Sequence, residues 1–74
     1  MEPNDRRVTI ASPDDRQRLV AELWSGGEIW AEVNQENDVL AIEIYRSKSG
    51  RPWQFTLAEL ESVLEQAKQA LATS

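Results

Sequence analysis

The sequence predicts an α+β fold: an antiparallel β-meander of three to four strands, with a C-terminal amphipathic helix packed on one face. Short apolar-rich runs alternate with polar or glycine-containing turns from residue 8 to residue 55, which is typical of strands joined by hairpins. Residues 39–45 alternate strictly between two faces, as a strand with one buried face does. Residues 57–72 carry apolar side chains at helical spacing instead.

A chain of 74 residues makes one small domain. Its polar residues 1–6 are expected to be disordered. Domains of this size are usually supported by disulfides, a metal or a partner chain. The chain has no Cys and no His, which excludes disulfides and removes the thiolate and imidazole ligands of metal sites. A well-packed core, a partner chain or both must therefore supply the stability.

The first third of the chain allows two interpretations. Residues 8–10 are expected to form a short strand. Ser12 can cap a helix and Pro13 suits its first position, so one alternative is a helix that runs on to Trp24. The other alternative is a single helical turn followed by a strand from about Leu19.

A hairpin over residues 19–33 is the favoured alternative, because the glycine pair at 26–27 separates two apolar-rich runs. A two-residue turn would shift the pairing by one position and place Glu22 on the apolar face. An unpaired buried carboxylate is costly. We therefore expect a three-residue turn at 25–27, which keeps the glutamates on the polar face.

The remaining elements follow in order. Residues 39–45 form the next strand, residues 46–51 a basic loop, and residues 52–55 a short edge strand with its proline at the start. Thr56 and Glu59 have the spacing of a capping box, in which each side chain bonds to the other residue's backbone N–H. A helix is expected to follow over residues 57–72.

The helix is expected to cover one face of the sheet. That face would carry the apolar residues Ile29, Ala31, Val33, Leu40, Ile42 and Ile44, with Trp53 and Phe55. The opposite face would be open, and Val20 and Val39 would share it with seven acidic and aromatic residues. We call those seven the acidic-aromatic face; they are Glu22, Trp24, Glu28, Trp30, Glu32, Glu43 and Tyr45.

Acids and bases are segregated along the chain. Residues 19–45 contain six acids and no Lys or Arg, and the net charge is −5. Aromatic residues often dominate binding energy, and acids around them would attract a basic partner. Three interpretations stay open for the acidic-aromatic face: a docking site for a basic protein, a homodimer interface, or a solvated sheet face.

No catalytic, cofactor or metal site is expected. Without His the commonest general base is missing, and the glutamates are not spaced to converge in a cleft. Arg46, Lys48 and Arg51 could hold a phosphate or an RNA backbone as an alternative function, although the net charge of −5 disfavours nucleic acid. The sequence has no apolar run long enough to span a membrane and no signal-peptide pattern at its start, so we expect a cytoplasmic protein.

Residues 19–71 resemble a set of short, uncharacterised bacterial proteins. The resemblance rests on residues 21–24, 35–36, 42–45 and 50–55 and on the helical Leu60, Leu64 and Ala67. In size, acidity and layout the chain is also similar to immunity proteins of contact-dependent inhibition and polymorphic toxin systems. That likeness implies an inhibitor that occludes a toxin, often a basic nuclease, and it transfers no functional residue. The expected function is thus a noncatalytic acidic interaction module, with self-association as the alternative.

Overall fold

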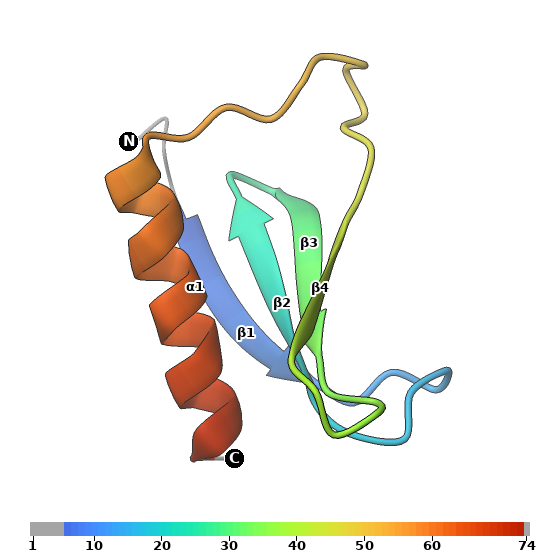
Figure 1. Cartoon of the computed structure of the whole chain (residues 1–74). Coiled ribbons are helices and arrows are strands. Elements are labelled where there is room, and N and C mark those ends of the chain that lie inside the picture. The colour runs from blue at the N-terminus through green and yellow to red at the C-terminus, as the bar shows by residue number, and fades with distance from the viewer. Residues whose placement is uncertain (1–5, 74) are drawn as a thin grey trace.

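The computed structural model describes residues 6–73 and shows a four-stranded antiparallel sheet with one helix (Figure 1). The elements in order are β1 (Arg6–Ala11), β2 (Val20–Ser25), β3 (Glu28–Asn34), β4 (Ala41–Ile44) and α1 (Leu57–Ala72). The strands lie in sequence order across the sheet, which confirms the predicted meander. The disorder expected for residues 1–6 lies outside the described residues, except at Arg6, which belongs to β1.

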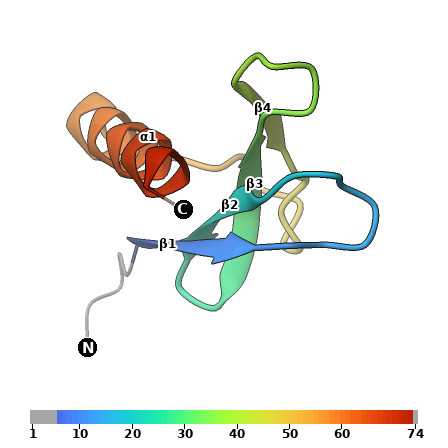
Figure 2. The ribbon, with the colours of Figure 1, turned by 90° about the horizontal axis from the view of Figure 1, so that it is seen from below.

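Helix α1 lies on one face of the sheet and packs chiefly against β1 and β2 (Figure 2). It begins with the predicted capping box: the Thr56 hydroxyl accepts a hydrogen bond from the Glu59 N–H at 3.0 Å, and the Glu59 carboxylate accepts one from the Thr56 N–H at 2.9 Å. The segment between β1 and β2 lies on the opposite side of the sheet from α1. That side is therefore partly covered as well.

The hydrophobic core lies between α1 and the central strands. Its buried residues are Ala21, Leu23, Trp30, Ala31, Val33, Val63, Ala67 and Leu71. Trp53 and Phe55 pack against it, as predicted, and the ring centroids of Trp30 and Phe55 are 4.5 Å apart. Residues 52–55 form no strand, so the predicted edge strand is wrong. This segment contributes aromatic side chains to the core without joining the sheet.

Residues 12–19 form a single turn and not a helix. The Arg16 N–H donates a hydrogen bond to the Pro13 carbonyl at 3.2 Å, and the chain then extends into β2 at Val20. The hairpin alternative is confirmed. The helix-start signals at Ser12 and Pro13 are followed by this one turn only. From Val20 the chain pairs instead with β1 and β3 on its two sides.

The predicted register of the β2–β3 hairpin is wrong. The turn contains only the two glycines 26–27, so that Trp24 pairs with Ile29, and the register then shifts so that Leu23 pairs with Ala31. Trp30 is the extra residue of this β-bulge. A bulge allows two successive residues to face the same side, and Trp30 joins Ala31 in the core.

The bulge resolves the conflict that argued against a two-residue turn. A two-residue turn without the bulge would place Glu22 on the face that packs against α1. With the bulge, Glu22 pairs with Glu32, and Glu32 pairs with Glu43. Residues paired across a sheet share a face, so the three glutamates lie in one row on the face away from α1.

The turn at Gly26 offers a test of backbone conformation alone. Gly26 has φ +63°, which L-residues rarely adopt, whereas Gly27 does not lie in this region. A Cβ would meet no atom within 4 Å at either position. We expect Gly26→Ala to lower the free energy of unfolding by about 1 kcal/mol and Gly27→Ala to change it much less, as measured by urea denaturation. Equal losses would contradict this assignment of the turn.

Candidate interaction surfaces

The acidic-aromatic face differs from its predicted form. Trp30 is only 2% exposed and belongs to the core, so its predicted place on the open face is wrong; the bulge turns it inward. Glu32 is 8% exposed. The others stay on the surface: Glu22, Trp24, Glu28 and Tyr45 are half-buried and Glu43 is exposed. Ile29, predicted on the helix side, pairs with Trp24 and shares its face.

Glu32 is the centre of a polar network on this face. Its carboxylate accepts hydrogen bonds from the Arg16 Nε at 2.9 Å and from the Tyr45 hydroxyl at 3.1 Å. The Arg16 Nη2 also bonds to the Glu43 carboxylate at 2.8 Å. One guanidinium therefore joins two glutamates that stand side by side in the sheet, and it offsets the repulsion between them.

Tyr45 reports on this network through its pKa. Burial raises the pKa of the Tyr45 hydroxyl to about 12, and the adjacent Glu32 carboxylate adds to the rise. The folded state favours the neutral hydroxyl of Tyr45. The contribution of this hydroxyl to the free energy of unfolding is therefore complete below the unfolded pKa of about 10, and it is lost as the pH rises through about 12.

The chain has one Tyr, so tyrosinate absorbance titrates this group without interference from another. We expect a midpoint near pH 12 and a lower midpoint in Glu32→Gln. We also expect the alkaline loss of stability to be smaller in Tyr45→Phe. A wild-type midpoint at the ordinary value of about 10 would contradict the network.

The segment that precedes β2 also contacts two acids of the turn between β3 and β4. Arg18 forms an ion pair with Asp38 at 2.6 Å, and the Glu36 carboxylate accepts the backbone N–H groups of Gln17 and Arg18 at 3.2 and 3.3 Å. Val20 is fully buried. The segregation of charges along the sequence thus brings a basic segment onto an acidic face of the same chain. Arg16 and Arg18 stand just before an acid-rich stretch in the sequence, and this is the signal that could have indicated pairing within the chain.

Trp24 has neighbours within its own chain. The Arg7 guanidinium lies 4.5 Å above its ring, and its indole N–H donates to the Thr9 hydroxyl at 3.0 Å. Thr9 in turn donates to the Glu22 carboxylate at 3.1 Å. Trp24 and Glu22 are therefore held in place on the surface, where β1 covers one side of the indole.

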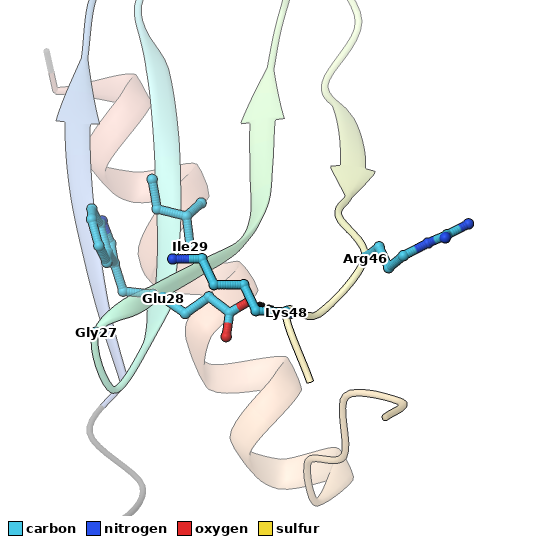
Figure 3. A pocket seen from close by; sticks show the side chains of 6 residues that line it. Gly27, Glu28, Ile29, Arg46 and Lys48 are labelled. Atoms are coloured by element: carbon cyan, nitrogen blue, oxygen red, sulfur yellow. Dashed lines mark hydrogen bonds between the residues drawn. The ribbon is translucent and has the colours of Figure 1, made fainter. Parts of the chain in front are cut away.

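A shallow open pocket lies at the hairpin end of this face (Figure 3). Its volume is about 360 Å³, and it is lined by Trp24, Gly27, Glu28, Ile29, Arg46 and Lys48. The Glu28 carboxylate accepts the Lys48 backbone N–H at 2.8 Å, while the Arg46 side chain points away from the other lining residues (Figure 3). The side chains of Arg46 and Lys48 do not converge on one point. The pocket therefore lacks the paired cations that would bind an anion.

The basic loop after β4 is a turn with exposed cations. The Gly50 N–H donates to the Ser47 carbonyl at 3.1 Å, and Gly50 has φ +79°. Arg46, Lys48 and Arg51 are exposed, and their side chains have no ion pair within residues 6–73. The phosphate or RNA function of this loop stays a prediction.

Strand β4 is the least covered part of the sheet. All four of its residues are exposed, and the apolar Leu40, Ile42 and Ile44 are 48%, 43% and 62% exposed. The prediction that α1 covers these three residues is wrong. The sheet twists so strongly that β4 turns away from the helix axis (Figure 2), and α1 packs against β1 and β2 instead.

A small apolar groove runs beside β4. Its volume is about 160 Å³, and it is lined by Val33, Leu40, Ala41, Ile42, Leu64 and Lys68. Leu40 and Ile42 belong both to the groove and to the exposed apolar row of β4. The uncovered strand face and the groove therefore form one continuous apolar surface.

The backbone of β4 also has a free edge. The Tyr45 N–H donates to the Trp30 carbonyl at 2.8 Å, and Glu43 and Ala41 continue the same register with β3. Backbone groups of an antiparallel strand alternate in direction, so those of Ile42 and Ile44 point away from β3. As β4 is the last strand of the sheet, these groups have no strand partner within the described chain.

We define the β4 surface as this free edge together with Leu40, Ile42 and Ile44. Within residues 6–73 no group of three or more acidic side chains is placed to hold a metal ion. No helix in the same range is long and apolar enough to cross a membrane. No protein-family model, curated protein or solved structure matches the chain.

Proposed function

We infer that this protein is a noncatalytic protein-interaction module that accepts an extended apolar strand at the β4 surface. The observation that supports it is that every residue of β4 is exposed while its outward backbone groups face no strand. Added strands bind by such main-chain hydrogen bonds, and the side chains on one face supply the apolar contact. The row of Leu40, Ile42 and Ile44 provides that contact.

The two edges of the sheet differ in their protection. Natural edge strands often carry charges that discourage pairing. Strand β1 begins with Arg6 and Arg7. Strand β4 has one charge, Glu43, and the Arg16 guanidinium already offsets it at 2.8 Å. Of the two edges, β4 is the one suited to accept a strand.

A synthetic peptide with the sequence of residues 39–45 is the direct probe, because its own alternation matches the β4 surface. We expect it to shift the NMR signals of Ile42 and Ile44. A matched pair of peptides tests the mechanism. N-methylation at the Ile42 position removes a donor on the pairing edge and should abolish binding. N-methylation at the Glu43 position blocks the far edge and should preserve binding. Equal binding of the two methylated peptides, or no binding of the parent peptide, would overturn the proposal.

The acidic-aromatic face as a docking site for a basic protein is the weaker proposal. Glu22, Glu28, Glu32 and Glu43 each already accept a hydrogen bond from the same chain, so a basic partner would have to replace these bonds. A lysine-rich peptide whose binding is lost in Glu22→Lys would support it. The immunity-type role and the cytoplasmic location stay predictions.

A further inference from the structure

We propose that the strand accepted at the β4 surface is β4 of a second copy of this chain, which joins two four-stranded sheets into one eight-stranded sheet across a two-fold axis at Ile42. This inference rests on the proposed function and names its partner. It differs from the homodimer considered for the acidic-aromatic face, because the shared elements are the edge and apolar face of β4.

The direction of the backbone groups selects the centre of this pairing. Ile42 and Ile44 point their backbone groups outward, and the alternation extends to Leu40, the residue before β4. A two-fold axis at Ile42 places Ile42 opposite its own copy and Leu40 opposite Ile44. Each of these pairs then exchanges both of its backbone hydrogen bonds. Centres at Ala41 or Glu43 would bring fewer outward groups together.

The charges select the same centre. With the axis at Ile42, each Glu43 faces Ala41 of the other copy, and each carboxylate keeps its own Arg16 at 2.8 Å. With the axis at Glu43, two glutamates would face each other, and like charges directly opposite destabilise a sheet. The pairing that forms the most hydrogen bonds is therefore also the one without facing carboxylates.

The apolar row becomes continuous in this arrangement. Leu40, Ile42 and Ile44 of both copies lie on one face, since paired residues share a face. Ile44 of the second copy lies opposite Leu40, which lines the groove beside Leu64. A single added strand buries less than the roughly 800 Å² per partner of a standard interface. We therefore expect a reversible dimer whose population rises with protein concentration.

Single-cysteine variants test this register cleanly, because the chain has no Cys. In the proposed dimer, positions 41 and 43 form a non-hydrogen-bonded pair with Cα atoms about 4.5 Å apart, which is within the range of a disulfide. We expect a mixture of Ala41→Cys and Glu43→Cys chains to form mixed disulfides under mild oxidation. Each variant alone should crosslink far less. Both residues are exposed, so the substitutions do not disturb the core.

Sedimentation equilibrium tests the dimer itself. We expect the wild-type chain to show a monomer–dimer equilibrium over a hundredfold concentration range of about micromolar to submillimolar. Ile42→Lys should shift this equilibrium at least about tenfold toward monomer. Leu57→Lys is the matched control, because Leu57 is 76% exposed at the start of α1, away from β4, and it should leave the equilibrium unchanged.

Each other outcome overturns the inference. Efficient crosslinking of Glu43→Cys or of Ala41→Cys alone would show another register. A chain that stays monomeric throughout the range, or a dimer insensitive to Ile42→Lys, would exclude the β4 dimer. In either case a peptide of residues 39–45 that still binds would leave the proposed strand addition standing. The failure of peptide binding as well would remove both.

Discussion

Trp30→Ala is expected to unfold the protein or to leave it at the edge of unfolding. Trp30 is 2% exposed and its ring lies 4.5 Å from that of Phe55. Replacing a buried Trp by Ala costs about 3–5 kcal/mol, and a domain of this size has a total stability of about the same magnitude. The measurement is urea denaturation followed by circular dichroism.

Trp24→Ala is the matched control for Trp30→Ala. Trp24 lies in the same hairpin and pairs with Ile29, but it is half-buried on the opposite face beneath Arg7. We expect its replacement to lower the free energy of unfolding by about 1–2 kcal/mol, since only part of its surface leaves water on folding. Equal losses for the two variants would contradict the observed register, because the two indoles would lie on the same face in the register of the predicted three-residue turn.

Arg16→Met should have the largest effect of any polar substitution. It keeps much of the aliphatic stem and removes the guanidinium that bonds to the buried Glu32 at 2.9 Å and to Glu43 at 2.8 Å. A buried carboxylate that loses its charged partner destabilises the folded state strongly. We expect the thermal midpoint to fall by about 10 °C.

Two further variants isolate the cause. Arg18→Met removes an ion pair with Asp38 that is far more exposed, and it should move the midpoint by less than about 3 °C. Adding Glu32→Gln to Arg16→Met removes the uncompensated charge and should restore most of the loss. Equal midpoints for the Arg16 and Arg18 variants, or no rescue by Glu32→Gln, would show that the network does not stabilise the fold.

The elements with local signals could be predicted from the sequence. The capping box at Thr56 and the helical spacing that follows define α1, and the alternation around Ile42 indicates β4. Both signals depend on neighbouring residues alone. The glycine pair likewise indicated the hairpin, although it could not distinguish a three-residue turn from a two-residue turn followed by a bulge.

The bulge at Trp30 could not be predicted, because its benefit lies in distant contacts. It places the Trp30 indole against Phe55 and keeps Glu22 beside Glu32. Both contacts join residues that are far apart in the sequence. The partner of Glu32 was missed for the same reason. Arg16 reaches Glu32 only because the segment before β2 folds over the sheet.

The exposure of β4 depends on how far the sheet twists beneath the helix. An alternating pattern shows that Leu40, Ile42 and Ile44 share a face, and it does not show which strands α1 reaches. The helix packs against β1 and β2, so the apolar row of β4 stays uncovered. The surface that carries the proposed function was therefore predicted as part of the core.

Amide hydrogen exchange along β4 tests the free edge most directly. In dilute protein we expect the amides of Ile42 and Ile44 to exchange rapidly and those of Ala41 and Glu43, which face β3, to exchange slowly. Raising the protein concentration or adding the peptide of residues 39–45 should slow exchange at Ile42 and Ile44 alone. Slow exchange of these two amides in the dilute monomer, or exchange that neither the concentration nor the peptide changes, would contradict an edge that is open and able to accept a strand.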